Sequence, residues 1–206
     1  MEISLLLAFA ATSLLVIISP GPDNLLVVSR GLSQGRYAAF TASLGSAMAV
    51  MVHTLVTALG FSLLIQSSPA VFMAVKLVGA SYLGYLGVKA IVARNVVSFS
   101  RSSRLPLGKV FAVSAMTGVL NPKSGLFLLA FLPQFVASGK NVAPAGLQMF
   151  FLGCLFAVLS LLVFGCMGAF AAQLSRWFEE RPASTLVLNA GAGLVFLAVA
   201  VSILFL

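Results

Sequence analysis

Acidic residues are nearly absent from this chain. Its 206 residues include four Asp and Glu against twelve Lys and Arg, and only 8% of the residues are charged. Asp23 is the only acidic residue between Glu2 and Glu179. Because about a quarter of the residues of a soluble domain are normally charged, this deficit excludes an ordinary soluble enzyme or binding domain.

Other scarce features narrow the function further. The chain has no Gly-x4-Gly-Lys-Ser/Thr phosphate loop, so we do not expect it to hydrolyse ATP. Cys154 and Cys166 lie on one predicted helix, about 18 Å apart along its axis, too far for the disulfide of a thiol–disulfide carrier. No nucleophile, base and orienting group stand together, so we predict neither an enzyme nor a cofactor.

Metal-ligating residues are also few. A metal exporter needs clustered carboxylate, His or Cys ligands. Asp23 and the single histidine, His53, make a thin set. A divalent metal-ion exporter of a related membrane fold is therefore kept only as the alternative function, with no metal site assigned.

Long apolar runs replace the missing charges. The chain is 61% hydrophobic and its mean hydropathy is +1.13. The longest stretch without Asp, Glu, Lys or Arg is 37–75. Because one span needs about 20 apolar residues, that stretch must hold two spans, separated at Gln66 to Pro69. Glu2 replaces the basic start of a signal peptide, so the first run is interpreted as a real helix. We predict an all-α polytopic membrane protein, a single transporter domain over 1–206, with six transmembrane helices at 3–28, 38–65, 69–92, 109–135, 144–174 and 184–206.

The net charge of +8 is explained by membrane orientation rather than by nucleic-acid binding. Three loops at 29–37, 93–108 and 175–183, with the adjoining helix ends, hold nine of the basic residues, and the opposite side has only Lys140. Positive residues stay in the cytoplasm, so we predict both termini outside and these loops inside, with the 93–108 loop against anionic lipid. The lipid bilayer is an expected partner and nucleic acid is not.

The first predicted span is interrupted by Ser19-Pro20-Gly21-Pro22-Asp23-Asn24. A carboxylate at bilayer depth costs roughly 2.5–3.5 kcal/mol on insertion scales and is by default a functional candidate. The prolines and the glycine break the helix where lipid cannot satisfy backbone groups, which requires protein or a polar cavity around the break. The segment therefore predicts a binding site.

Two lysines and one histidine also lie inside predicted spans. Lys123 follows Asn121-Pro122 near the middle of 109–135, where an ammonium needs a partner or water. Lys76 lies about 10 Å into the third span, from where its side chain could also reach the outer head groups. His53 suits a proton carrier because imidazole titrates near pH 6.5, although a neutral, hydrogen-bonded imidazole is the simpler interpretation.

Pro22-Asp23-Asn24 has an echo one hundred residues later in Pro122-Lys123-Ser124. Each motif falls in the first helix of a three-helix half, 3–92 and 109–206. An odd number of spans per half inverts the second half, and matching proline breaks point to an inverted-repeat transporter site. Asp23 and Lys123 could pair there if the first helix breaks at Pro20 to Pro22.

These motifs resemble those of the LysE/RhtB family of amino-acid exporters. The resemblance covers the whole length and is carried by Ser-Pro-Gly-Pro-Asp-Asn with Gly31, Gly35 and Gly45, by Lys76 with Gly79-Ala80-x-Tyr82-Leu83 and Gly87, and by Phe111 to Gly118 with Asn121-Pro122-Lys123 and Phe131-Leu132-Pro133-Gln134-Phe135. It implies an exporter of amino acids or small derivatives in the bacterial inner membrane, driven by proton antiport. It does not name the substrate.

The expected site follows from a zwitterionic substrate. Asp23 can bind its ammonium, while Lys123 or the N–H groups of a half-helix can bind its carboxylate. The candidate substrate-binding residues are Pro20, Gly21, Pro22, Asp23, Asn24, Asn121, Pro122 and Lys123, and the proton-coupling candidates are Asp23, His53 and Lys76. Asn189 to Gly193 is a small-residue stretch that is interpreted as a helix contact, with a homodimer interface as one reading of it.

Overall fold

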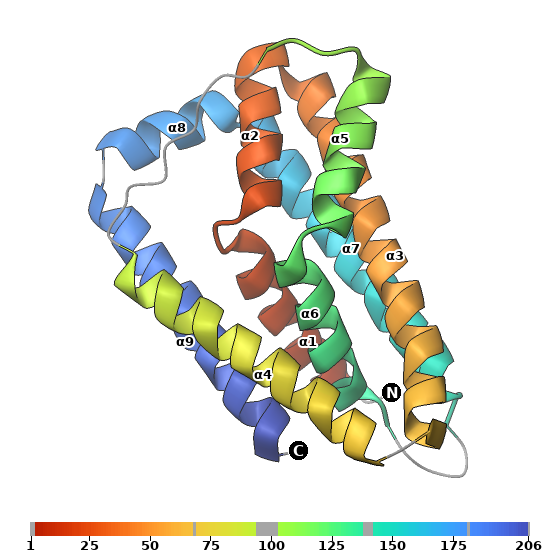
Figure 1. Cartoon of the computed structure of the whole chain (residues 1–206). Coiled ribbons are helices and arrows are strands. Elements are labelled where there is room, and N and C mark those ends of the chain that lie inside the picture. Colours follow the sequence, from red (N-terminus) through yellow and green to blue (C-terminus); the bar gives the residue numbers. More distant parts are fainter. Residues whose placement is uncertain (1–2, 68, 94–102, 138–141, 181, 206) are drawn as a thin grey trace.

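The computed structural model describes residues 3–67, 69–93, 103–137, 142–180 and 182–205, which are all-helical and contain no sheet (Figure 1). The elements in chain order are α1 (Ile3–Ile18), α2 (Pro22–Gln34), α3 (Arg36–Ser67), α4 (Pro69–Val92), α5 (Leu107–Val119), α6 (Pro122–Phe131), the 3₁₀ turn η1 (Leu132–Phe135), α7 (Ala145–Ala169), α8 (Ala171–Glu180) and α9 (Pro182–Phe205).

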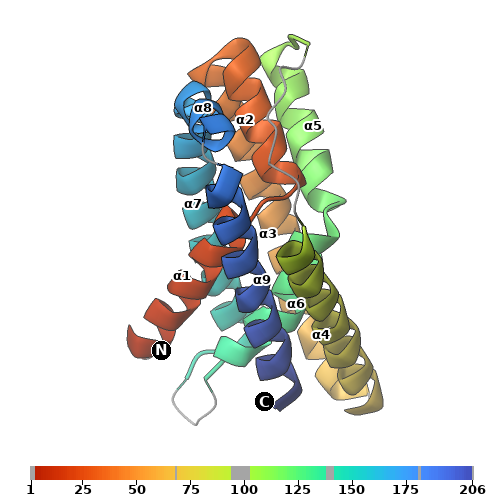
Figure 2. The ribbon, with the colours of Figure 1, turned by 90° about the vertical axis from the view of Figure 1, so that its left-hand side faces the viewer.

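Both proline motifs break their helices as predicted. The axes of α1 and α2 meet at 62°, and those of α5 and of α6 with η1 meet at 53°. Proline lacks an N–H and disfavours a helical conformation in the residue before it, so Pro20 and Pro22 end α1 and let α2 begin again after the extended Gly21. Pro122 opens α6 in the same way, after the extended Asn121. Figure 2 shows α1 leaving the bundle at an angle below α2.

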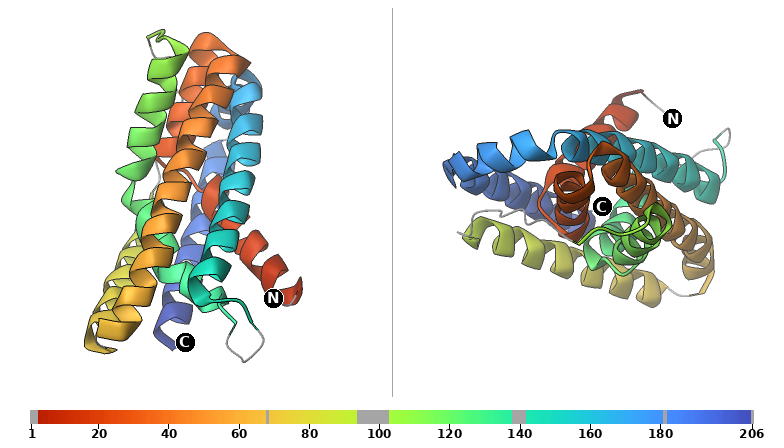
Figure 3. Two further views of the ribbon diagram at one scale, coloured as in Figure 1. Left: turned by 90° about the vertical axis from the view of Figure 1, so that its right-hand side faces the viewer. Right: turned by 90° about the horizontal axis from the view of Figure 1, so that it is seen from above.

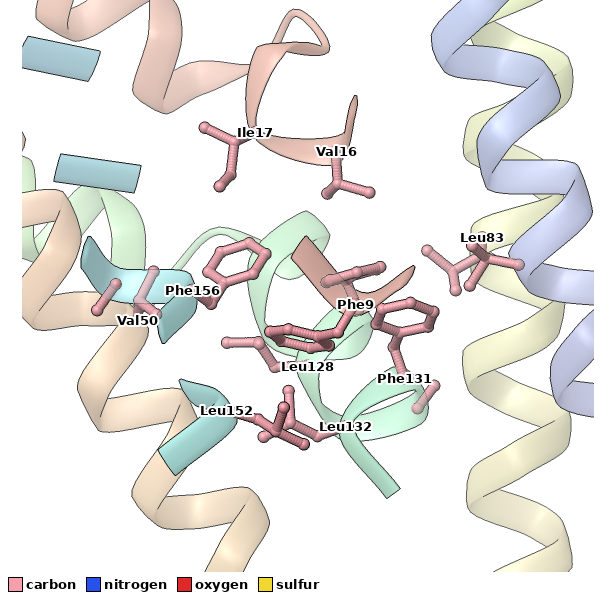
Figure 4. Close-up of a cluster of buried hydrophobic side chains, with 14 of the residues drawn as sticks. Phe9, Val16, Ile17, Val50, Leu83, Leu128, Phe131, Leu132, Leu152 and Phe156 are labelled. Carbon is pink, nitrogen blue, oxygen red and sulfur yellow. The ribbon is translucent and has the colours of Figure 1, made fainter. Parts of the chain in front are cut away.

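Two groups of long helices surround these breaks. The long helix α3 packs against α5 and α7, and α4 packs along α9 as a separate pair (Figures 1 and 3). The half-helices α1 and α6 lie between the two groups and are held by phenylalanine contacts (Figure 4). The ring of Phe131 is stacked on Phe9 and Phe127, with centroids 5.9 and 4.5 Å apart, and Phe127 reaches Phe156 of α7 at 5.7 Å. This apolar cluster fixes where the breaks meet.

Membrane-spanning capacity is clear for most of the described helices. Arg36–Gly60, Ala145–Ala169 and Leu186–Leu204 are long and apolar enough to span a bilayer, and the two bent pairs raise the number of candidate spans to five. The remaining predicted span, 69–92, corresponds to α4, a helix of 24 residues that is not among those candidates in the described part of the chain.

Several predicted boundaries were wrong. The 29–37 segment is not a loop, because α2 continues to Gln34 and ends at Gly35, whose φ of 82° favours glycine. Arg30, predicted in that loop, is buried on α2 and donates from Nη1 to Ser103 O at 2.8 Å. The fifth helix ends at Ala169 rather than 174, and most of the predicted 175–183 loop belongs to the amphipathic helix α8. The basic residues of this segment suggest a loop, but its amphipathic periodicity is that of a helix.

Most of the described basic residues that were predicted to share one side of the membrane gather at one end of the molecule (Figure 1). The C-terminus of α2, the N-terminus of α5 and helix α8 lie at one end, and both termini lie at the other (Figure 1). The basic residues Arg30, Arg36, Arg104, Lys109 and Arg176 belong to the first end. Residues 94–102 of the predicted 93–108 loop, and Lys140, lie outside the described residues.

Candidate functional site

Asp23 and Asn121 join the two helix breaks. Asn121 Nδ2 donates to Asp23 Oδ2 at 2.6 Å, and both side chains are buried. Asn121 Oδ1 also accepts from the backbone N–H of Lys123 at 3.0 Å and so caps α6. One amide therefore holds the start of α6 and the carboxylate at the start of α2 together.

Lys123 reaches back to the α1–α2 connection. Its Nζ donates to Ser19 O at 2.7 Å and lies 5.8 Å from the ring centroid of Phe196 on α9. A Cβ built on Gly21 would lie 3.2 Å from this Nζ, so the glycine leaves room for the ammonium. Lys123 and Asp23 attract each other electrostatically, but they are linked through Asn121 rather than by a direct ion pair. The structure thus brings the two predicted charges into one site.

Asn24 has a structural position in the break. Its Nδ2 donates to Ile17 O at 2.8 Å, satisfying a carbonyl in the last turn of α1 that the break leaves without its helical partner. The side chain is buried. Asn24, one of the predicted substrate-binding residues, therefore stabilises the helix break. Its side-chain NH2 group is already used in the bond to Ile17 O.

His53 approaches the same site from α3. Its Nε2 lies 3.1 Å from Gly118 O, and because a carbonyl only accepts, Nε2 carries the hydrogen in this arrangement. Gly125 makes room for the imidazole, since a Cβ there would lie 2.8 Å from the ring. Lys76, the other coupling candidate, is half-buried on α4 and lines neither cavity described below.

Two cavities adjoin the breaks and share Lys123. The larger has a volume of about 400 Å³ and lies between the breaks and the α4–α9 pair. Its lining comprises Ser19 to Pro22, Asn121 to Lys123, Tyr82, Leu86, Lys89, Ala90, Ala93, Asn189, Ala192 and Phe196. The smaller, of about 20 Å³, lies on the other side. It is lined by Asp23, Asn24, Ser46, Gly118, Lys123, Ser124 and Ser160 together with apolar side chains of α1, α3 and α7.

The sequence interpretation missed several of these lining residues. Ser46 and Ser160 are single hydroxyls in apolar runs, a weak signal because serine often satisfies its own helix backbone. The segment from Asn189 to Gly193 was read as a helix contact with a homodimer interface as one possibility. Within the chain, Asn189 lines the larger cavity, and a Cβ on Gly193 would lie 2.6 Å from Gly87 O of α4. Gly193 is thus a helix contact inside the chain, and the homodimer interface stays a prediction.

Comparison with known proteins identifies the family. The sequence model of the LysE type translocator family matches residues 14–206. The chain belongs to this family. It is similar to the leucine efflux protein of Salmonella typhimurium, with 26% identity over 192 residues that cover 91% of this chain and 89% of the relative.

Two further relatives are named only as membrane proteins. The uncharacterized membrane protein YrhP of Bacillus subtilis is 30% identical over 185 residues, covering 85% of this chain and 87% of the relative. One from Pseudomonas aeruginosa is 27% identical over 194 residues, covering 91% and 89%. No solved structure matches the chain. This LysE-type translocator is therefore a multi-pass membrane transport protein.

Proposed function

We propose that this translocator is a secondary transporter that exports an amino acid with an apolar side chain across the bacterial inner membrane. The observation that carries the proposal is that Asp23 and Lys123 lie at two broken helices, joined through Asn121, beside a 400 Å³ cavity that Lys123 lines. Small-molecule sites typically have volumes of roughly 300–1,000 Å³. The relative named as a leucine efflux protein supports an amino-acid substrate.

The larger cavity offers distinct groups for each part of such a substrate. Its carboxylate would bind the Lys123 ammonium and the first N–H groups of α2 and α6, which carry partial positive charge. Leu86 and Phe196 would contact an apolar side chain, and Tyr82 and Asn189 add polar groups to the same wall. Asp23 does not line this cavity, because Asn121 lies between the two. Its carboxylate would attract the substrate's ammonium across Asn121, or would contact it directly after Lys123 moves.

The transport architecture follows from the breaks. We propose six spans, α4 included, arranged as inverted repeats over 3–92 and 109–206, with the breaks at equivalent places. At 24 residues, α4 would be about 36 Å long, enough for a span. The basic end of the molecule would face the cytoplasm and both termini the outside.

Energy for export would come from proton antiport. The chain has no phosphate loop, and one charge crossing 100 mV provides about 2.3 kcal/mol. Asp23 and His53 are the coupling candidates we favour, because both lie near Gly118: His53 Nε2 is 3.1 Å from its carbonyl oxygen, and a Cβ built on Gly118 would lie 3.4 Å from Asp23 Oδ1. A divalent metal substrate gains no support, because no group of three or more His, Cys, Asp or Glu residues occurs within the described ranges.

Efflux of preloaded, radiolabelled leucine from bacterial cells tests this function. We expect expression of the wild type to speed efflux, and Lys123→Gln and Asp23→Asn to abolish the gain at equal membrane abundance. Lys109→Gln and Glu180→Gln are matched controls, since both residues are exposed and line neither cavity. If no amino acid leaves faster while a divalent cation does, the proposed substrate class is wrong.

A further inference from the structure

Three buried oxygen atoms that have no hydrogen-bond partner among the described residues gather around the 20 Å³ cavity. They are Asp23 Oδ1 on α2, Ser46 Oγ on α3 and Ser160 Oγ on α7. The exposed fractions of these side chains are 6, 2 and 1%. Ser46 lies close enough to the Asp23 carboxylate to donate to it after a small rotation, and this pairing would leave Ser160 Oγ without a partner. Because leaving a buried polar group unpaired costs about 1–3 kcal/mol, three such oxygens around one small space indicate a ligand.

Backbone carbonyls at the ends of two broken helices also border this cavity. Val16 and Ile17 from the end of α1, and Gly118 from the end of α5, also line it. Helix C-termini carry partial negative charge. Val16 O and Ile17 O each accept one side-chain hydrogen bond, from Ser19 Oγ and Asn24 Nδ2, and keep a second lone pair. Gly118 O accepts from His53 Nε2 and from the backbone N–H of Asn121. The broken helices of secondary transporters use such carbonyls, together with side-chain oxygens, to coordinate Na⁺ or H⁺.

The donor set and the size select among cations. A volume of about 20 Å³ holds roughly one water-sized particle, so a hydrated ion is excluded and a dehydrated one fits. The carboxylate and the hydroxyls of Ser46 and Ser160 supply a single negative charge and only oxygen ligands, which suits a hard, singly charged cation. Ser124 adds a third neutral hydroxyl to the lining. A proton would need only one of these oxygens and no cavity. Ser46 lies beside the Asp23 carboxylate, and its lone pairs stay available even if it donates a hydrogen bond.

We propose that this cavity is a Na⁺ site formed by Asp23, Ser46 and Ser160. Lys123 lines the same cavity and is attracted to the same carboxylate. Its ammonium therefore competes with Na⁺, and withdrawal of Lys123 toward the larger cavity strengthens the site. Na⁺ binding in the smaller cavity is in this way linked to the position of Lys123, which lines both cavities.

The site can be measured without any amino acid, so its failure is separate from failure of the proposed export. The purified full chain in detergent is heated in NaCl, KCl or choline chloride at one ionic strength, and ²²Na⁺ binding is measured in parallel. We expect a higher Tm and saturable binding in NaCl alone. Ser160→Ala should weaken Na⁺ binding at least tenfold, and Lys123→Met should tighten it.

Ser13→Ala is the matched control, because Ser13 is also buried with an unpartnered hydroxyl but does not line the cavity. It should leave Na⁺ binding unchanged. Ser46→Ala replaces Ser160→Ala if the latter does not fold. Equal Tm values in all three salts, or Na⁺ binding that Ser160→Ala and Ser46→Ala both retain, would overturn the proposal. A pH-dependent Tm that is indifferent to Na⁺ would likewise overturn it and assign the cavity to a proton and water.

Discussion

Asn121 and Asp23 are 98 residues apart in sequence and 2.6 Å apart in space, amide nitrogen to carboxylate oxygen. This hydrogen bond crosses from one broken helix pair to the other. Asn121 also caps α6, so the position of the Lys123 backbone depends on the amide that holds Asp23. The geometry of one break is thereby transmitted to the other.

Replacing Asn121 with Ala should destabilise the protein although both charges of the site remain. The alanine removes a helix cap, worth about 1 kcal/mol, and leaves both Asp23 oxygens buried without partners, a further cost of about 1–3 kcal/mol. In the Asp23→Asn variant, by contrast, the new side-chain carbonyl would still accept from the Asn121 amide. Denaturant unfolding in detergent measures both variants against the wild type, and an unchanged unfolding free energy in Asn121→Ala would contradict the shared role of Asn121.

The charges of Asp23 and Lys123 should be energetically coupled although they do not touch. We expect Asp23→Asn combined with Lys123→Gln to destabilise less than the sum of the single variants, by about 0.5–3 kcal/mol, because each single variant leaves an uncompensated buried charge. The double-mutant cycle uses unfolding in detergent, with export scored alongside. Asp23→Asn with Lys109→Gln is the control cycle. A coupling energy in this control as large as that between Asp23 and Lys123 would indicate a nonspecific charge effect.

The breaks could be predicted from sequence, whereas the contacts between them could not. Pro20, Pro22 and Pro122 are local signals, since proline disrupts a helix wherever it falls. The Asn121 link and the Ser46–Ser160 cavity depend on how four helices converge, which no local pattern specifies. Arg30 was misplaced for the same reason: only the structure reveals the carbonyl of residue 103 that satisfies its guanidinium and lets it be buried.

Gly125→Ala should impair export by displacing His53. A Cβ at residue 125 would lie 2.8 Å from the imidazole, so the ring must move away from Gly118 O and from the site. Gly60→Ala is the control, because a Cβ there meets nothing within 4 Å. Efflux rates at matched expression measure the effect. Normal efflux by Gly125→Ala would show that the position of His53 does not matter for transport.

Cysteine labelling should establish the orientation. In a background with Cys154 and Cys166 replaced by serine, Ser103→Cys should react with an impermeant maleimide only after the cells are opened. Val142→Cys, which replaces an exposed residue, should react in intact cells. These outcomes follow from the cytoplasmic preference of basic loops. Labelling of position 103 in intact cells would contradict both the orientation and the six-span arrangement.

Filling the larger cavity should change which amino acids are exported. Leu86 lines that cavity from α4, so Leu86→Trp should reduce leucine efflux about tenfold by occupying the space of the substrate's side chain, while alanine efflux falls less. One methylene in an apolar pocket changes discrimination by about 1–3 kcal/mol, so a whole indole should be decisive. The control is Leu77→Trp, because Leu77 lies on the same helix, is exposed and lines no described cavity. This variant should transport normally. If Leu86→Trp exports leucine and alanine in the wild-type ratio, the substrate's side chain does not occupy this cavity.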